Sequence, residues 1–596
     1  MRRLIASLAV FAALARSLVA QQPVDAPSIS IDDLKPGQQG EVWTVFQGTQ
    51  PERFQVAVTG VLRNALGPGK SLIVCELTDP RVQKMGATAG MSGSPLYVEG
   101  KFAGALSYQI QRFETVRHAG FTPAADLAEV RDRASLQSNM LVQNDASPRS
   151  SASPYHAMQP VFTLGGLSPA VADLFAPRLT ALGLNATALG GSTQGSSVST
   201  ANSSPAVARL QTQNPQAGRA PLQPGGAVAV ALATGDITLA GTGTVSRVDG
   251  EKVTAFGHPM LSLGDVALPM CSSEILTILS SQMQSVKIAN TGEVIGTISQ
   301  DRLSAVSGSL GEGPKMTHVE VTVTPLRGAP RTLKFSVARQ QQLTPTLVAA
   351  GVSQAILGSN DGGLANGFRL SSNIAFPATS KLAFQTIYSG PQAFAQGLGE
   401  FISGLSANLQ NPYAKTFPEQ VSFSIEPLET NPSVTLDLFQ LSRATAEAGQ
   451  TIQVSLGWRD YQGDAHREII DLPIDPAWTG KQLEVVLAPG RALDELTGRP
   501  RVISASELRS FEAYISAMRD DRRTDGVCIA VVERATLFSD QTVSTTETPG
   551  SIERIARAAD EARFRRREGF VPLWEKHVLP GKLLGSVVRR PLAVVD

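Results

Sequence analysis

The segment Ala89-Gly90-Met91-Ser92-Gly93-Ser94-Pro95 constrains the fold more than any other part of the sequence. It lies between two short apolar runs, Ser71–Leu77 and Leu96–Val98, and therefore predicts a tight turn between strands. Glycines on both sides of Ser92 allow backbone conformations that other residues rarely adopt, so the serine hydroxyl can project from the turn. The segment favours a β-rich fold and makes Ser92 a candidate nucleophile.

The same turn predicts a pair of backbone donors beside the serine. The N–H groups of Gly90 and Ser92 are the candidate oxyanion hole, because donors aimed at a carbonyl oxygen stabilise the charge that develops there. An α/β-hydrolase elbow would need G-x-S-x-G before a helix, but position 94 is serine and a strand-like run follows. A Gly/Ser-rich turn with no chemical role is the alternative that this segment alone leaves open.

Apolar runs separated by Gly, Pro and Asn predict two blocks of strands. In the second block a helix is expected to begin near Ser272 or Ser273, with Glu274 in its first turn and apolar residues after it. Further helices are expected after Ser168-Pro169 and after Thr344-Pro345. No internal repeat of fixed period is apparent.

These patterns divide the chain into seven segments and predict a mainly β protein. The segments are a signal peptide (1–20), a β half-barrel with the serine (28–135), a linker with a small helical unit and a low-complexity segment (136–221), a second β half-barrel (222–337), an α+β region (338–428), a β-sandwich-like domain (429–490) and a mixed C-terminal region (491–596).

The N-terminus has the pattern of a secretory signal. Arg2 and Arg3 precede the apolar run Leu4–Leu14, and Leu18-Val19-Ala20 ends in a small residue. We therefore expect an exported protein that is periplasmic, associated with the cell envelope or secreted; a retained N-terminal anchor is the alternative. No later stretch approaches about 20 uninterrupted apolar residues, so no transmembrane span is expected after signal removal.

Composition argues against several other classes of protein. Lys+Arg 52 equals Asp+Glu 52, so there is no basic surplus that would indicate a nucleic-acid partner. Cys75, Cys271 and Cys528 allow at most one disulfide and lack metal-ligand spacing. The sequence also has no P-loop, dinucleotide fingerprint or HExxH motif, so neither a metal nor another cofactor is expected.

The serine segment resembles a known family. Gly90–Pro95, the apolar strand after it, Gly100-Lys101 and Gly104-Ala105 are similar to the SpoIVB peptidase family, serine peptidases with a trypsin-like double β-barrel. Leu77-Thr78-Asp79-Pro80-Arg81 resembles the Thr-Asp-x-Arg stretch that carries the acid of that family. The resemblance implies a double β-barrel built from two separated halves, with Ser92 as nucleophile and Asp79 as acid.

A second segment resembles the part of that family that carries the histidine. Thr254–Pro259 is similar to its Ala-Leu-Gly-His segment, which implies that His258 is the general base. The family usually places the histidine half first, whereas Ser92 precedes His258 here; triads are defined by geometry, so the order does not forbid catalysis. His118 is a reserve base, and Asp265 and Asp301 compete with Asp79 as the acid.

Together these features predict an exported serine endopeptidase that cleaves a polypeptide in the cell envelope. Ser92 would attack the scissile carbonyl, His258 would transfer the proton and Asp79 would orient the imidazole. The alternative is a non-catalytic envelope binding or scaffold protein that keeps the barrel. The permuted order and the appended C-terminal segments motivate that alternative.

Overall fold

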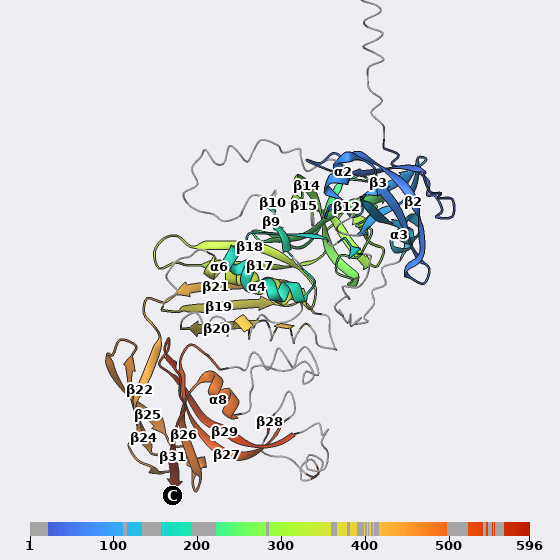
Figure 1. The fold of residues 1–596 in the computed structure, drawn as a ribbon. Helices are drawn as coiled ribbons and strands as arrows, with labels where there is room; N and C mark the ends of the chain where they lie inside the picture. The colour runs from blue at the N-terminus through green and yellow to red at the C-terminus, as the bar shows by residue number, and fades with distance from the viewer. Residues whose placement is uncertain are drawn as a thin grey trace, which may run out of the picture.

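The computed structural model describes most of the chain. Its three units lie in chain order along the length of the molecule (Figure 1). The described residues are 22–110, 116–133, 156–192 except 159, 185 and 190, 222–281, 285–358, 366–377, 382–389, 416–497, 522–539 and 565–596, with a few isolated positions in 398–409 and 544–554. The predicted signal peptide and almost all of the predicted low-complexity segment lie outside them. The expected mainly β fold is confirmed.

The first unit is a closed barrel of six strands, coloured blue in Figure 1. Its strands follow the order β1-β2-β3-β6-β5-β4, and β4 pairs with β1 to close the ring. Alternate residues in the first half of β2, Phe54, Val56 and Val58, are buried, as expected for a strand with one face on a core. The strands are β1 (Gln39–Thr44), β2 (Glu52–Gly67), β3 (Lys70–Leu77), β4 (Pro95–Val98), β5 (Lys101–Gln109) and β6 (His118–Pro123), with the helices α2 (Pro80–Met85) and α3 (Ala124–Asp132) and the short strand β7 (His156–Ala157) beside them.

The second unit contains another closed ring of six strands. Its order is β11-β12-β13-β16-β15-β14, and β14 pairs with β11 to close it. The two rings therefore have the same connectivity, although no fixed-period repeat is visible in the sequence. The strands are β11 (Ala227–Gly235), β12 (Thr238–Asp249), β13 (Lys252–Ala255), β14 (Gly264–Leu279), β15 (Val286–Arg302) and β16 (Ala305–Leu310).

The helix predicted from Ser272 or Ser273 is wrong, because this segment is the second half of β14. It pairs with β15 as far as the Leu279↔Val286 pair. Ile275 is 1% exposed and Leu276 is 43% exposed, so burial changes from one residue to the next as in a strand. Pairing with β15 overrides the local pattern of apolar residues, which fits a helix equally well.

The β14–β15 hairpin extends beyond its own barrel and contacts the first barrel. Ile275 in β14 forms a bridge with Gly48, and Val286 in β15 forms a bridge with Ala89. Ile275 also packs in a small buried cluster with Val45, which follows β1. The hairpin therefore joins the two barrels next to the serine segment.

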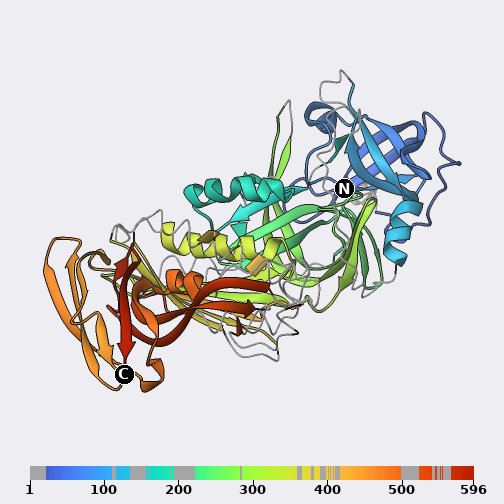
Figure 2. The ribbon, with the colours of Figure 1, turned by 90° about the horizontal axis from the view of Figure 1, so that it is seen from below.

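The sheet of the second barrel continues on both sides. The confirmed helices, α4 (Pro169–Ala181) and α6 (Leu343–Leu357), pack against each other over one face of this sheet (Figure 2). On one side follow β18 (Arg331–Ala338), β17 (Met316–Val323), β21 (Gln420–Pro427), β19 (Phe368–Ala375) and β20 (Leu382–Tyr388); on the other follow β8 (Val161–Gly165) and β9 (Ala186–Leu189), and β10 (Gly191–Ser192) pairs with β15. Part of the predicted linker thus belongs to this sheet.

The C-terminal unit is a sandwich of two sheets with one core. Strands after residue 490 supply much of the second sheet, so the sandwich is longer than the predicted segment 429–490. One sheet contains β22 (Ser433–Leu441), β24 (Thr451–Asp460), β25 (Ala465–Pro473) and β30 (Leu583–Leu584); the other contains β23 (Thr445–Glu447), β26 (Gln482–Pro489), β27 (Val527–Ser539), β28 (Ser544–Thr545), β29 (Arg565–Val578) and β31 (Val588–Val595), with the helices η2 (Pro476–Trp478) and α8 (Gly490–Thr497).

Cys75, Cys271 and Cys528 are buried free thiols. Within the described ranges, no helix is long and apolar enough to cross a membrane.

Candidate active site

Ser92 lies in the connection between β3 and β4, after the short helix α2. Gly90 and Gly93 flank it, and both have φ of 94°, a conformation that L side chains rarely adopt. Ser92 is completely buried, and its Oγ has no hydrogen-bond partner among the described residues. The turn thus has the glycine geometry expected from the sequence, with a hydroxyl that no described residue engages.

The backbone N–H groups of this turn divide into two sets. Those of Ala89, Met91, Gly93 and Ser94 donate to the carbonyl oxygens of Ser285, Thr88, Leu106 and Met91, at 2.7–3.0 Å. Those of Gly90 and Ser92 donate no hydrogen bond within the described part of the chain. They are the two donors that the sequence singled out as a candidate oxyanion hole. Buried N–H groups are rarely left without acceptors, so this pair is a chemically distinctive feature.

The second barrel holds the serine turn directly. Thr244 in β12 donates its N–H to Ser92 O at 2.8 Å and its Oγ1 hydroxyl to Gly90 O at 3.0 Å. A Cβ at Gly93 would collide with Thr244 O and with the backbone of Phe256. The turn therefore fits against the second barrel only because residue 93 is glycine.

His258 occupies the corresponding connection of the second barrel, between β13 and β14. It is 1% exposed, and its Nδ1 lies 2.8 Å from Pro259 O. Because a carbonyl oxygen can only accept, Nδ1 carries the hydrogen, and the neutral ring then has its lone pair on Nε2. This is the tautomer that a general base needs.

The first barrel in turn contacts the histidine loop. Thr122 in β6 donates its Oγ1 hydroxyl to Gly257 O at 2.6 Å. Phe256 and Gly257 have φ of 71° and 69°, so the chain bends sharply just before His258. Each barrel thus donates hydrogen bonds to the loop of the other: the second barrel to the Ser92 turn and the first barrel to the His258 loop. These contacts bring the turn and the loop together at the interface.

Asp301 holds the turn that follows the histidine. Its carboxylate accepts hydrogen bonds from the N–H groups of Met260, Leu261 and Leu263, at 2.7, 2.9 and 3.1 Å. Asp301 is 1% exposed, and burial raises its pKa. The sequence had offered Asp301 as an alternative acid for the imidazole; in the structure it fixes the loop whose Pro259 carbonyl orients His258. Spacing alone could not identify this function, because it depends on the pairing of β14 with β15.

Asp79 caps the helix α2. Its Oδ1 accepts from Arg81 N at 2.8 Å, and its Oδ2 lies 3.2 Å from the Arg81 guanidinium. Burial acts to raise the pKa of Asp79, but the hydrogen bonds and charge of Arg81 outweigh it and lower the pKa. These contacts give Asp79 a structural role, and its assignment as the acid stays a prediction.

The other alternative residues also have local contacts. The Asp265 carboxylate lies 3.1 Å from Arg302 and accepts from Gln300 at 2.7 Å. His118 begins β6, and its Nδ1 lies 3.1 Å from Val116 O. None of these contacts involves the serine turn.

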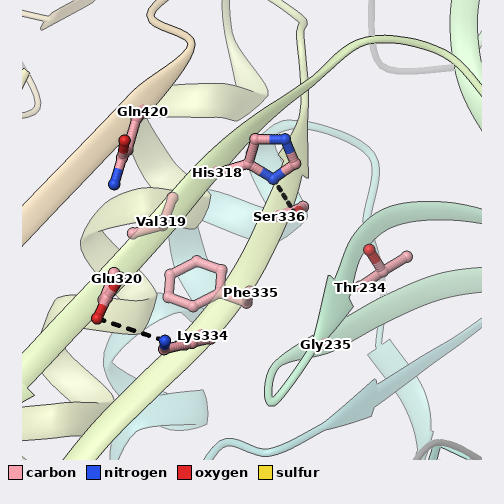
Figure 3. Close-up of a pocket in the computed structure, with 9 residues that line it drawn as sticks. All are labelled: Thr234, Gly235, His318, Val319, Glu320, Lys334, Phe335, Ser336 and Gln420. Atoms are coloured by element: carbon pink, nitrogen blue, oxygen red, sulfur yellow. Dashed lines mark hydrogen bonds and ion pairs between the residues drawn. The ribbon is translucent and has the colours of Figure 1, made fainter. Parts of the chain in front are cut away.

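A separate hollow of about 310 Å³ lies on the extended sheet of the second unit (Figure 3). His318 lies 2.9 Å from Ser336 Oγ, and Glu320 forms an ion pair of 3.6 Å with Lys334. The lining contains none of the predicted site residues. In the described part of the chain, no group of His, Cys, Asp and Glu side chains is arranged to hold a metal ion.

Comparison with known proteins gives one positive result. No curated protein and no solved structure matches the chain. Residues 7–113 match the family model described as SpoIVB peptidase S55, a range that contains Asp79, Gly90 and Ser92 and ends before the barrel of His258. The resemblance of the serine segment is therefore confirmed: residues 7–113 of this chain are similar to the SpoIVB peptidase S55 family.

Proposed function

We propose that this protein is an exported serine endopeptidase that cleaves a polypeptide in the cell envelope, with Ser92 as its nucleophile. The observation that carries the proposal is the serine turn itself. It combines a hydroxyl without a hydrogen-bond partner with two N–H groups that have no acceptor among the described residues. The match of residues 7–113 to a peptidase family supports the same reaction class.

In this mechanism Ser92 Oγ attacks the scissile carbonyl carbon and gives its proton to Nε2 of His258. Negative charge forms on the carbonyl oxygen, which accepts hydrogen bonds from the N–H groups of Gly90 and Ser92. One such donor contributes roughly 10²–10³-fold to the rate in serine peptidases. His258 then gives the proton to the leaving amine as the C–N bond breaks, and water hydrolyses the acyl-enzyme by the reverse sequence.

The hydrogen bond from His258 Nδ1 to Pro259 O supports this assignment, because it keeps the lone pair on Nε2. Asp79 as the orienting acid is proposed on the family resemblance alone, since its contacts in the structure are with Arg81. Export is proposed from the N-terminal signal pattern, Arg2-Arg3 followed by Leu4–Leu14.

A second candidate function is a non-catalytic binding or scaffold protein of the envelope. One observation favours it: Ser92 is 0% exposed and His258 is 1% exposed. A polypeptide can reach Ser92 Oγ only after the two barrels or their loops move. A protein without catalysis would have no need for that movement.

Ser92→Ala and a matched control distinguish the two functions. Ser246 lies in β12, and its Oγ is also buried without a hydrogen-bond partner among the described residues. We expect Ser92→Ala to abolish hydrolysis of an unfolded polypeptide such as casein and labelling by a fluorophosphonate, while Ser246→Ala retains both. Equal labelling of wild type and Ser92→Ala, or none of wild type, would reject the peptidase and leave the scaffold.

A further inference from the structure

Lys287 is a fully buried lysine next to the serine turn. It is the second residue of β15, and its Nζ donates to Thr44 Oγ1 at 2.8 Å. No carboxylate forms an ion pair with it in the described part of the chain. A buried amine whose charge no partner balances is uncommon, because an ammonium loses much of its solvation free energy on burial.

The lysine side chain lies against Gly90. A Cβ built on Gly90 would be 3.0 Å from Lys287 Cβ and 3.2 Å from Lys287 Cδ, so the aliphatic stem covers this glycine. The backbones are also joined, since Lys287 N–H donates to Ala89 O at 3.0 Å and Ala89 N–H donates to Ser285 O at 2.9 Å. Nζ is two bonds, about 2.5 Å, beyond Cδ, so the amine lies within about 6 Å of the position of that Cβ.

The charged groups on the neighbouring elements have partners elsewhere. Glu41 in β1 pairs with Arg53, and the residue opposite Lys287 on β14 is Ile278. The turn from Gly86 to Pro95 has no ionisable side chain. Asp301 on β15 is bound by the turn after His258. Burial alone lowers the pKa of Lys287, to about 7.

Stability does not account for a lysine at this position. An apolar side chain of similar length would pack against Gly90 without losing the solvation of an ammonium. Buried groups with altered proton affinity are concentrated at catalytic sites, where a charge is needed during reaction. Lys287 fits that pattern because the residue it covers is half of the candidate oxyanion hole.

We propose that Lys287 is a charged residue of the Ser92 site, whose ammonium stabilises the negative charge that forms on the substrate oxygen beside the N–H groups of Gly90 and Ser92. The effect acts through space in a water-excluded interior, where a full charge several ångströms away still contributes. This inference rests on the proposed serine peptidase. Attack, proton transfer to His258 and departure of the leaving group are the same as described above.

The inference gives a direction for the pH dependence. The ammonium form is populated below pH 7, so its contribution decreases as pH rises through about 7. The reactivity of Ser92 should therefore have an alkaline decrease that belongs to Lys287, in addition to the increase with pH that reports the general base.

The experiment measures the rate constant for labelling of Ser92 by a fluorophosphonate from pH 6 to pH 10, on the full chain. The Oγ–P bond forms, the P–F bond breaks, fluoride leaves and the serine proton goes to the general base. We expect Lys287→Met to slow labelling at least tenfold at pH 6.5 and to remove the alkaline decrease, while its melting temperature stays the same or rises. Lys287→Arg, which remains charged, should keep the rate and also lack the decrease.

The outcomes separate this inference from the proposed function. Labelling of Lys287→Met at the wild-type rate at every pH, with Ser92→Ala unlabelled, would overturn the role of Lys287 and leave the peptidase intact. Slow labelling together with a lower melting temperature would also overturn it, because Lys287 would then be a packing residue. If wild type is not labelled at Ser92, both proposals are wrong.

Discussion

The two six-stranded barrels have the same strand order but hold their functional loops in different ways. Ser92 and His258 both lie between the third and fourth strands of their rings, so equivalent connections meet at the interface. The fourth and fifth strands differ most: β4 and β5 have 4 and 9 residues, whereas β14 and β15 have 16 and 17. The longer hairpin reaches the first barrel and brings Lys287 to the serine turn.

The His258 loop and the Ser92 turn also differ in the hydrogen bonds that hold them. Asp301 in the histidine's own barrel binds three N–H groups of the turn after His258. No carboxylate among the described residues binds the serine turn, which is held by Leu106 of its own barrel and by Thr244 and β15 of the other barrel. Changes at the interface should therefore affect Ser92 more than His258, while changes at Asp301 should affect the histidine loop.

The largest effect is expected for Gly93→Ala. The new Cβ would collide with Thr244 O, and alanine is also strained at φ of 94°. We expect fluorophosphonate labelling of Ser92 to fall at least a hundredfold and the melting temperature to fall by several degrees. Gly37→Ala is the matched control, because φ is 86° there but nothing lies within 4 Å of the added Cβ. Equal effects in both variants would show that the barrel contact does not hold the turn.

Asp301→Asn should have the next largest effect. The amide has one acceptor oxygen where the carboxylate has two, so a buried N–H of the 260–263 turn loses its partner at a cost of about 1–3 kcal/mol. Labelling should fall roughly tenfold to a hundredfold, because a misplaced His258 would keep only part of the roughly 10²–10⁴-fold that a positioned general base contributes. The pH at which the labelling rate increases should also shift, because the orientation of His258 changes.

The control for this variant is Asp265→Asn, which removes a partly exposed ion pair with Arg302. We expect less than about 1 kcal/mol from that change. If the two variants have the same stability and the same labelling rate, the histidine loop does not depend on Asp301.

Lys287→Met tests the stability of the hairpin contact. The folded-state pKa of Lys287, about 7, is below its ordinary value of 10.5, so burying the charged form destabilises the wild-type fold. As pH falls from 10.5 to 7 this penalty grows, and below 7 it is constant. Denaturant unfolding should therefore find the variant more stable than wild type, with the largest difference at or below pH 7. A difference that is independent of pH from 7 to 10 would mean that the lysine keeps its ordinary pKa and stays charged in the folded state.

The sequence was informative where local patterns decide the structure. The glycines around Ser92 predicted the turn and its pair of N–H groups, and Ser168-Pro169 and Thr344-Pro345 predicted two helices. It was wrong at Ser272–Glu274, because the apolar spacing of this segment fits a helix and only long-range pairing with β15 makes it a strand. For the same reason, no local pattern singled out Lys287, and Asp301 was a candidate only as an alternative acid. Their roles depend on contacts between strands far apart in the sequence, such as Lys287 with Gly90.

The smallest effect is expected for Asp79→Asn. This variant tests whether the first barrel supplies a carboxylate to the site, as the second barrel does with Asp301. Asparagine is as good an N-cap as aspartate, so α2 should remain capped while the ion pair with Arg81 is lost, at a cost below about 1 kcal/mol. We expect labelling of Ser92 to change less than threefold, because the contacts of Asp79 in the structure are with Arg81 and Pro259 O occupies His258 Nδ1. A hundredfold decrease at unchanged stability would assign Asp79 as the acid, as the family resemblance implies. Catalysis would then require a movement that brings Asp79, in the β3–β4 connection, to the imidazole of His258. The acid and the nucleophile would come from the first barrel and the base from the second.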